Sequence, residues 1–338
     1  MQHKRIIGRL APSPTGYLHL GNAWAFLCAW LGARSVGGRL ILRIEDIDPQ
    51  RSKPELAVAL MEDLRWLGLD WDVGPYYQGE RLTGYAAALE NLKERGLIYP
   101  CFCTRKELRS LAGAPQQGDG AGDGLAGESV YPGLCRDLPE AEREERLRAG
   151  RSFSWRLRVA PAGGNLLASE FLQVNDLVMG RVEFTPEQAA GDFALCRSDG
   201  VFAYQLAVVL DDIAMGVNQV VRGADILHST PRQLYLYSLL GAVPPAYAHI
   251  PLLLDHRGER LAKRHASISL RALRQAGVRP QAVVGWLAVW AGLAEVGVGG
   301  FQSMNATELL PEFSFRRINA APGRLPADIA KVLGCGAL

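Results

Sequence analysis

The chain has 338 residues, 48% of them hydrophobic, and its 37 basic and 35 acidic residues give a net charge of +2. That length suits two or three packed units of roughly 100–200 residues each, and the near-neutral charge excludes a uniformly basic nucleic-acid coat. No apolar run reaches the ~18–20 residues of a membrane span, and the first residues do not resemble a secretory signal. Six cysteines are few for this length, so we expect a cytoplasmic protein without membrane contact, and a monomer.

The first predicted elements form a βαβ unit. Arg5–Leu10 is typical of a buried strand, and two prolines and a glycine turn residues 11–16 into a loop. Apolar residues recur at helical spacing over His19–Val36 until two glycines end the helix, and Arg39–Ile44 follows as a second strand. This order predicts an α/β fold whose parallel sheet binds ligands at the carboxyl ends of its strands.

The rest of the chain predicts further helices and strands around a glycine-rich loop. Residues 113–127 include six glycines, so we expect this loop to be flexible. The other expected elements are helices over Pro54–Leu67 and Tyr85–Gly96, strands over Ser152–Val159 and Val182–Phe184, buried segments over Ala203–Leu210 and Val217–Val221, a hairpin over Leu252–Leu261 and helices over Ser269–Leu293. The last stretch, Pro322–Leu338, is expected to be loosely held.

The first chemical signal is the segment from Pro12 to Asn22, where a loop enters a helix. A helix N-terminus presents unpaired N–H groups that favour phosphate. Gly21 lets a flat nucleotide lie against the backbone, and His19 can donate to a phosphate oxygen as the bond to the α-phosphorus changes. The alternative is a capped helix whose histidine has only structural partners.

The second signal is Arg260-Leu261-Ala262-Lys263-Arg264, which follows the predicted hairpin. A mobile lysine can clamp the β- and γ-phosphates and stabilise pyrophosphate as it leaves. The alternative is a solvated basic turn. Lys263 is one of 6 lysines in a chain with 31 arginines, and this rarity favours a functional lysine.

Charged residues at the strand ends predict an amino-acid pocket. Glu45 follows the second strand, where a carboxylate can bind an ammonium group. Arg9 and Arg222 end two other strands, and guanidinium groups bind carboxylates in a bidentate way. Tyr204 can donate its hydroxyl to the same ligand. One acid and two arginines complement a dicarboxylic amino acid, although ordinary ion pairing at a sheet edge would explain any one of them.

Three cysteines and a tyrosine have the spacing of a metal site. Cys101 and Cys103 form a C-x-C pair, and Cys135 follows Tyr131 by four residues. Three thiolates and a phenol oxygen could hold structural Zn²⁺ in tetrahedral geometry. The alternatives are buried free thiols, or a different fourth ligand, namely His3 or His249.

The two chemical signals resemble known sequence signatures. His19-Leu20-Gly21-Asn22 is similar to the first signature of class I aminoacyl-tRNA synthetases, and the segment around Lys263 is similar to the second. Asn22 replaces the usual second histidine, Arg260 a lysine and Ala262 a serine. The segments that resemble glutamyl-tRNA synthetases in particular are 9–16, 43–46, 77–81, 204–207 and 221–225.

This resemblance implies a fold and a site. The fold would be a Rossmann-type parallel sheet with a zinc-bearing insert and a C-terminal helical subdomain. ATP with Mg²⁺ would be a substrate, bound by His19, Gly21, Asn22, Arg260 and Lys263, of which His19 and Lys263 would be catalytic. L-glutamate would contact Arg9, Ala11, Ser13, Glu45, Tyr204 and Arg222, with its amino group on Glu45 and its side-chain carboxylate on Arg222.

The expected domain organisation follows the same resemblance. The catalytic domain would comprise 1–97 and 195–245, separated by the insert 98–194, and 246–338 would hold the activation loop and a helical subdomain. Only 75 residues follow Lys263. This number is too small for a helical linker and an anticodon-binding domain of roughly 100–150 residues, so we expect that domain to be missing.

The cysteine pattern with Tyr131 resembles the zinc knuckle of one subgroup, the glutamyl-Q tRNA(Asp) synthetases. With the missing domain, it implies activation of glutamate without tRNA and transfer to queuosine in the anticodon loop of tRNA(Asp). Two alternatives stay open. One is a short glutamyl-tRNA synthetase that charges the 3′ end of tRNA(Glu). The other is a non-catalytic paralogue, which the changes at Arg260 and Ala262 favour.

Overall fold

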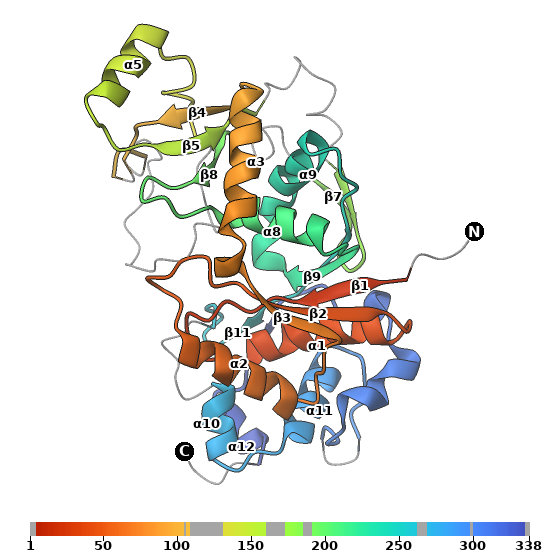
Figure 1. Ribbon diagram of the computed structural model, residues 1–338. Helices are drawn as coiled ribbons and strands as arrows, with labels where there is room; N and C mark the ends of the chain where they lie inside the picture. Colours follow the sequence, from red (N-terminus) through yellow and green to blue (C-terminus); the bar gives the residue numbers. More distant parts are fainter. Residues whose placement is uncertain are drawn as a thin grey trace.

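The computed structural model describes residues 5–104, 106–108, 131–159, 173–184, 191–261, 269–297 and 300–334. Figure 1 shows a central sheet with a helical layer below it and a second group of helices and short strands above it. No described helix combines the length and the apolar character that a bilayer span requires. The loop predicted to be flexible, 113–127, lies outside the described residues.

The central sheet is parallel, as the βαβ pattern predicts. Its strands are β1 (Ile7–Leu10), β2 (Arg39–Ile44), β3 (Val73–Tyr77), β9 (Gln219–Gly223) and β10 (Ala246–Ile250). They pair in the orders β1-β2-β3 and β10-β9. Asn218 N donates to Ile7 O at 3.0 Å, which joins the start of β9 to β1. All these pairs are parallel, so the carboxyl ends of β1, β2 and β9 meet at one edge.

One helical layer packs beneath the sheet (Figure 1). It comprises α1 (Leu20–Arg34), α2 (Pro54–Trp66), α10 (Leu270–Gln275), α11 (Pro280–Trp290) and α12 (Ile329–Val332), with the 3₁₀ turns η4 (Ala306–Glu312) and η5 (Phe315–Arg317). Helix α1 is buried along most of its length, because it lies between the sheet and the other helices of this layer. The ring centroids of Trp24 in α1 and Trp290 in α11 lie 5.3 Å apart in an edge-on contact.

The C-terminal segment is packed rather than loose, so that prediction is wrong for residues 322–334. Strand β11 (Leu253–Leu254) pairs in parallel with β12 (Gly323–Arg324). The segment also supplies three leucine and isoleucine side chains to the main core, each 3–4% exposed: Leu325, Ile329 and Leu333. The predicted hairpin over Leu252–Leu261 is a tight turn closed by a single antiparallel bridge between Leu254 and Arg260.

A second group of helices lies above the sheet and has its own core. These helices are α3 (Leu82–Glu94), α8 (Tyr204–Ala214) and α9 (Thr230–Leu239), with the 3₁₀ turns η1 (Gln78–Glu80) and η2 (Ala224–Ser229). Five leucines of the core beneath them are fully buried: Leu92, Leu157, Leu195, Leu206 and Leu236. Helix α3 begins before the predicted start, and α1, α2 and α8 lie where helical or buried segments are predicted.

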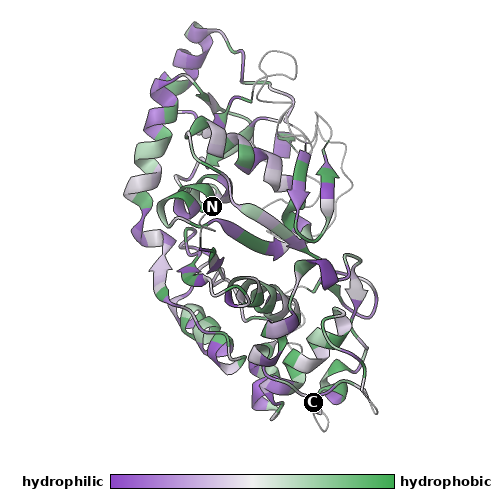
Figure 2. Cartoon of the chain, turned by 90° about the vertical axis from the view of Figure 1, so that its right-hand side faces the viewer, coloured by the Kyte–Doolittle hydropathy of each residue, from purple (hydrophilic) through white to green (hydrophobic). Residues whose placement is uncertain are grey.

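Short strands form the outer part of the molecule. β4 (Ile98–Cys101), β5 (Ser154–Leu157) and β8 (Phe193–Cys196) make an antiparallel sheet, and β6 (Gln173–Asp176) and β7 (Gly180–Glu183) make a hairpin. The outermost helix, α5 (Glu140–Arg148), has no buried residue, and Figure 2 shows it as mostly hydrophilic. Asp192 ties this region together because Arg136 donates to both of its carboxylate oxygens, at 2.6 and 2.7 Å. The domain boundaries proposed from the sequence stay predictions.

Candidate active site

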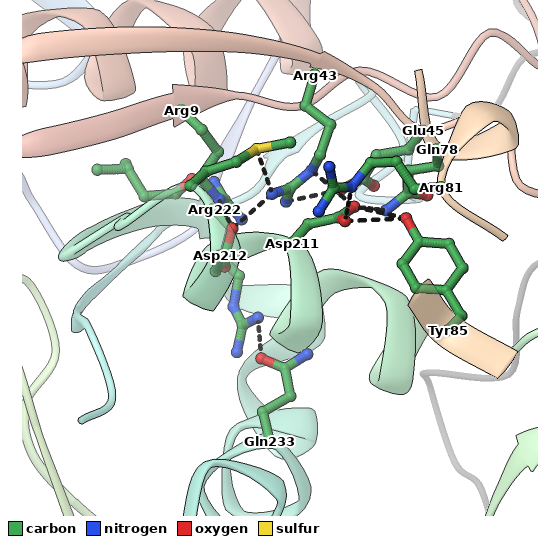
Figure 3. Close-up of polar contacts among 12 residues, drawn as sticks. Arg9, Arg43, Glu45, Gln78, Arg81, Tyr85, Asp211, Asp212, Arg222 and Gln233 are labelled. Atoms are coloured by element: carbon green, nitrogen blue, oxygen red, sulfur yellow. Dashed lines mark hydrogen bonds and ion pairs between the residues drawn. The ribbon is translucent and has the colours of Figure 1, made fainter. Parts of the chain in front are cut away.

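Figure 3 shows three of the residues predicted to bind glutamate, Arg9, Glu45 and Arg222, beside α8. Arg9 lies in β1, Glu45 directly follows β2, and Arg222 lies in β9. Tyr204 is the first residue of α8. Burial raises the pKa of Tyr204, while the charges of Arg222, Glu45 and Arg9 all act on its hydroxyl. The structure therefore brings these four side chains, from four different elements, into one region.

The loop after β1 lies along the same region. Glu45 N donates to Pro12 O at 2.9 Å, and Thr15 N donates to Ser13 O at 2.8 Å. The first bond holds the loop against the end of β2, so Ala11 and Ser13, the neighbours of Pro12, lie near Glu45, and the second bond closes a turn within the loop. Ser13 is exposed and Ala11 is partly exposed, which leaves both accessible to a ligand.

Arg9 is buried but incompletely paired. Its Nη1 donates to Val221 O at 3.1 Å, and its Nε lies 3.7 Å from Asp212 Oδ1. The Nε–H has no hydrogen-bond partner among the described residues, although the residue is only 6% exposed. A buried donor without a partner usually indicates an absent ligand or water.

Arg222 has a different environment. It is 5% exposed, and its guanidinium donates to three neutral acceptors: His249 Nε2 at 2.9 Å, Gln233 Oε1 at 2.7 Å and Thr230 Oγ1 at 2.9 Å. Among the described residues, no carboxylate oxygen lies within 4.0 Å of it. A buried cation without an ion-pair partner is costly, so this position favours a carboxylate ligand.

Arg43 organises the floor of the site and is fully buried. Its Nη1 donates to Asp212 Oδ1 at 2.7 Å, and its Nη2 donates to Glu45 Oε1 at 3.2 Å. Burial lowers the pKa of Arg43, but Asp212, Glu45 and Asp211 together raise it by more. Burial also raises the pKa of Glu45, against the opposing effects of Arg43 and Arg9. The Glu45 carboxylate is thus held in place by a cation that stays charged.

Asp211 connects α8 to the segment that leads into α3. It is fully buried and accepts from three side chains (Figure 3): Gln78 Nε2 at 2.9 Å, Arg81 Nε at 2.6 Å and Tyr85 Oη at 2.9 Å. The sequence analysis did not select Asp211, Asp212 or Arg43 as site residues. The signal for them was the presence of charged residues inside apolar segments, which are costly to bury unless they are paired.

The start of α1 is a capping box. His19 Nδ1 accepts from Asn22 N at 3.3 Å, and His19 N donates to Asn22 Oδ1 at 3.1 Å. Asn22, which stands where the family usually has histidine, therefore holds His19 by its side chain. A Cβ on Gly21 would lie 3.0 Å from the His19 ring, so a larger residue there would crowd the histidine. This capping geometry is compatible with a phosphate site at the same helix end.

Leu261 of the second signature, and Ser269 a few residues after it, lie beside the first signature. A Cβ on Gly21 would be 3.6 Å from Leu261 Cδ1, and Ser269 forms an antiparallel bridge with His19. Ala262 and Lys263 themselves lie outside the described residues. Arg260 is half exposed and its Nη1 lies 3.8 Å from Asp225 Oδ2, so its predicted contact with ATP stays a prediction.

The cysteine cluster has the geometry of a metal site. The sulfur atoms of Cys101, Cys103 and Cys135 all lie within 4.8 Å of one another, and Tyr131 Oη lies 3.3 Å from Cys101 Sγ. Sulfur atoms at the corners of a Zn²⁺ tetrahedron, with Zn–S of ~2.3 Å, would be about 3.8 Å apart. Cys103 Sγ and Cys135 Sγ are 3.6 Å apart. The donor set therefore fits a tetrahedral metal.

The alternative fourth ligand His249 does not fit. Its Nδ1 lies 2.6 Å from Asp176 Oδ2 and its Nε2 accepts from Arg222, so both ring nitrogens are occupied elsewhere. His3 lies outside the described residues. Of the candidate fourth ligands, Tyr131 is the one that the described structure brings to the sulfur atoms.

Comparison with known proteins decides the family. Residues 5–304 match the family model for the catalytic domain of class I tRNA synthetases (E and Q). A glutamyl-Q tRNA(Asp) synthetase from Nitratidesulfovibrio vulgaris is 57% identical over 297 residues, which are 85% of this chain and 87% of that protein. One from Symbiobacterium thermophilum is 47% identical over 340 residues, covering 98% of this chain and 99% of that protein. The chain belongs to the glutamyl-Q tRNA(Asp) synthetase family.

This family membership agrees with the solved structures that resemble the chain. A glutamate tRNA ligase from Elizabethkingia meningosepticum, in complex with its amino acid, superposes with a TM-score of 0.76 at 27% identity, covering 98% of this chain and 69% of that one. The glutamate–tRNA ligase 2 of Syntrophus aciditrophicus is 41% identical, and the alignment covers 91% of this chain and 61% of that protein. The α/β fold with a parallel sheet is therefore that of a class I synthetase.

Proposed function

We propose that the chain activates L-glutamate with ATP, without tRNA, and transfers it to queuosine in the anticodon loop of tRNA(Asp). The observation that carries glutamate activation is the convergence of Arg9, Glu45 and Arg222, in which Arg222 has no carboxylate partner among the described residues. Glu45 binds the amino group, Arg222 the side-chain carboxylate, and Arg9, Ala11, Ser13 and Tyr204 complete the pocket.

The first step forms glutamyl-adenylate. An oxygen of the glutamate α-carboxylate attacks the α-phosphorus of ATP, the bond between that phosphorus and the bridging oxygen of the β-phosphate breaks, and pyrophosphate leaves. His19, Gly21 and Asn22 present the start of α1 to the phosphates. Lys263 and Arg260 stabilise the departing pyrophosphate, whose charge Mg²⁺ also offsets.

The second step transfers the glutamyl group. A hydroxyl oxygen of the queuosine diol attacks the activated carbonyl, its proton is lost, and AMP leaves with the bonding electron pair. The support for this acceptor comes from the relatives in Nitratidesulfovibrio vulgaris and Symbiobacterium thermophilum. Both are named glutamyl-Q tRNA(Asp) synthetase, and the match covers 87% and 99% of their own lengths. The glutamate–tRNA ligase 2 of Syntrophus aciditrophicus is matched over 61% of its length. Its identity to this chain, 41%, is lower than the 57% and 47% of the two glutamyl-Q tRNA(Asp) synthetases, and this difference favours queuosine over the 3′ end of tRNA(Glu).

We also propose that Cys101, Cys103, Tyr131 and Cys135 hold structural Zn²⁺. The three thiol groups lie close enough to share one ion, and a bound Zn²⁺ would replace three thiol protons by one divalent charge. Because these residues lie at the end of β4 and in the segment before α5, the ion would pin the outer part of the molecule. The described cysteines form no disulfide bond with one another, which suits a reducing cytoplasm.

The monomeric state expected from the sequence stays a prediction.

The test of activation is ATP–pyrophosphate exchange in the absence of tRNA. We expect exchange that depends on glutamate. Glutamine should not support exchange, because its side-chain amide cannot supply the carboxylate that Arg222 needs as a partner. A protein with no glutamate-dependent exchange, although it binds both substrates, would be the non-catalytic paralogue and would contradict the proposal.

A further inference from the structure

The orientation of Arg222 depends on residues that the proposed function does not yet include. The partners of its guanidinium, His249, Gln233 and Thr230, are all uncharged acceptors, and the guanidinium carbon lies 4.8 Å from the ring centroid of Tyr247. Such partners fix the direction of the group without neutralising it. A carboxylate in their place would hold Arg222 equally well but would compete with an anionic ligand.

His249 can fill this role only in one state. It is fully buried, and burial lowers its pKa to about 4 although the hydrogen bond with Asp176 opposes that shift. The ring is therefore neutral and carries one N–H. Since Nε2 accepts from Arg222 Nε at 2.9 Å, the proton lies on Nδ1, which donates to Asp176 Oδ2 at 2.6 Å. In the opposite tautomer, the Nε2–H of His249 would face the Nε–H of Arg222, and two donors would meet without an acceptor.

Asp176 is held so that it enforces this tautomer. Its Oδ1 accepts from the backbone N–H groups of Val178 and Met179, at 2.9 Å each, and the His249 N–H is shared between Oδ1 and Oδ2, at 3.0 Å from each. Its other oxygen, Oδ2, faces the His249 ring. Leu177 N donates to Tyr247 O at 2.9 Å, so the β6–β7 hairpin is also bonded to β10 directly beside this contact.

We propose that Asp176 and His249 are positioning residues that hold Arg222 for the side-chain carboxylate of glutamate. This inference deepens the proposed function and rests on it. Asp176, from the β6–β7 hairpin, orients a histidine of β10, which in turn orients an arginine of β9. In metal sites, a carboxylate often fixes the tautomer and the orientation of the histidine that binds the metal. Here the same kind of pair orients the histidine that binds Arg222. The hairpin thereby sets the selectivity of a pocket that it does not line.

The sharpest variant is Asp176→Asn. The backbone N–H groups of Val178 and Met179 keep an oxygen at the Oδ1 position, so the new amide NH₂ faces His249 Nδ1 and moves the ring proton to Nε2, against Arg222. We expect the KM for glutamate to rise about 10- to 100-fold, the range expected for losing a hydrogen bond to a charged group. The KM for ATP should change less than about twofold. Glu183→Gln, an exposed carboxyl-to-amide change in the same hairpin, is the matched control.

A second pair of variants separates positioning from folding. His249→Leu removes the acceptor and should raise the KM for glutamate as Asp176→Asn does. His249→Gln places an amide oxygen near the position of Nε2 and should restore most of the affinity. Because the lost contact serves the side-chain carboxylate, the preference for glutamate over glutamine should fall in Asp176→Asn and His249→Leu. If Asp176 and His249 served only the fold, the variants would contain less active protein. The apparent kcat would then fall, and the KM for glutamate would stay unchanged.

Pyrophosphate exchange by all five proteins distinguishes the outcomes. A raised KM for glutamate in Asp176→Asn and His249→Leu, with recovery in His249→Gln, supports the relay. Wild-type exchange with an unchanged KM for glutamate in those two variants would overturn the relay and leave the proposed function standing. A wild-type protein that shows no exchange would overturn the proposed function and the relay with it.

Discussion

At the residue scale, Glu45 is the acid that we propose binds the amino group of glutamate. Glu45→Ala should lower kcat/KM for pyrophosphate exchange about 10- to 100-fold, because the ammonium group loses a charge-assisted hydrogen bond. The fold should persist, since Arg43 keeps Asp212 at 2.7 Å as a partner. Glu45→Gln, which retains an oxygen for Arg43, is the control. Its kcat/KM should lie between those of the wild type and of Glu45→Ala. Normal exchange in Glu45→Ala would mean that the amino group binds elsewhere.

His249 predicts how stability depends on pH. Its pKa is lowered from the usual 6.5 to about 4, chiefly by burial. Between these values the unfolded chain binds a proton that the folded protein does not, so stability is lost as the pH falls. The free energy of unfolding should decrease by about 2 kcal/mol between pH 7 and pH 5 from this group alone. Urea denaturation should show a smaller decrease in His249→Gln, and equal decreases in both proteins would contradict the assignment.

Part of the site was predictable at this scale and part was not. Arg9, Glu45 and Arg222 follow from the rule that ligands bind at the carboxyl ends of parallel strands. Arg43 and Asp212 are 169 residues apart, and nothing local in either segment indicates that they pair. Asp176 and His249 are 73 residues apart, and a histidine in an apolar strand is equally consistent with packing or with a metal ligand. Such partners become visible only when tertiary contacts are known.

At the element scale, the start of α1 is stabilised by a capping box and is proposed to bind the phosphates of ATP. Asn22→Ala removes one half of the capping box with His19 and should cost about 1 kcal/mol of stability. Asn22→Asp keeps the acceptor, so it should retain stability but raise the KM for ATP, because its negative charge repels the phosphates. Thermal denaturation and ATP kinetics measure the two effects separately. A stable Asn22→Ala protein would show that the capping box contributes little.

The cysteine cluster is the second element that can be tested by substitution. Cys101→Ser should lose bound Zn²⁺, because one of the three thiolates is removed. Cys196→Ser is the matched control, a buried cysteine outside the cluster. Metal analysis of the purified proteins should find about one Zn²⁺ in the wild type and in the control. Full zinc occupancy in Cys101→Ser, or none in the wild type, would contradict the ligand set.

Elements with strong local patterns were predictable, and those that depend on distant partners were not. The periodic apolar residues and the glycine stop placed α1 within two residues of its ends. The C-terminal segment was misjudged because its short β12 pairs with β11, about 70 residues earlier in the chain. Its buried leucine and isoleucine positions were too few to reveal a helix before that pairing was known.

At the scale of the whole molecule, hydrogen bonds connect the outer strands to the parallel sheet. The β6–β7 hairpin bonds to β10 through Asp176 and Leu177, and Asp211 joins α8 to the segment before α3. The proposed glutamate pocket thus lies where the sheet and the helices above it meet, and the hairpin is connected to it through β10. The resemblance of this arrangement to glutamate tRNA ligases explains why the acceptor cannot be read from the pocket alone.

The most direct test of the central claim is the position of the label after incubation with ATP and radioactive glutamate. We expect tRNA(Asp) that carries queuosine to be labelled, with the label in the anticodon-loop fragment after nuclease digestion. The same tRNA without queuosine should remain unlabelled. Label on the 3′-terminal adenosine of tRNA(Glu), or equal labelling of tRNA(Asp) with and without queuosine, would contradict the account.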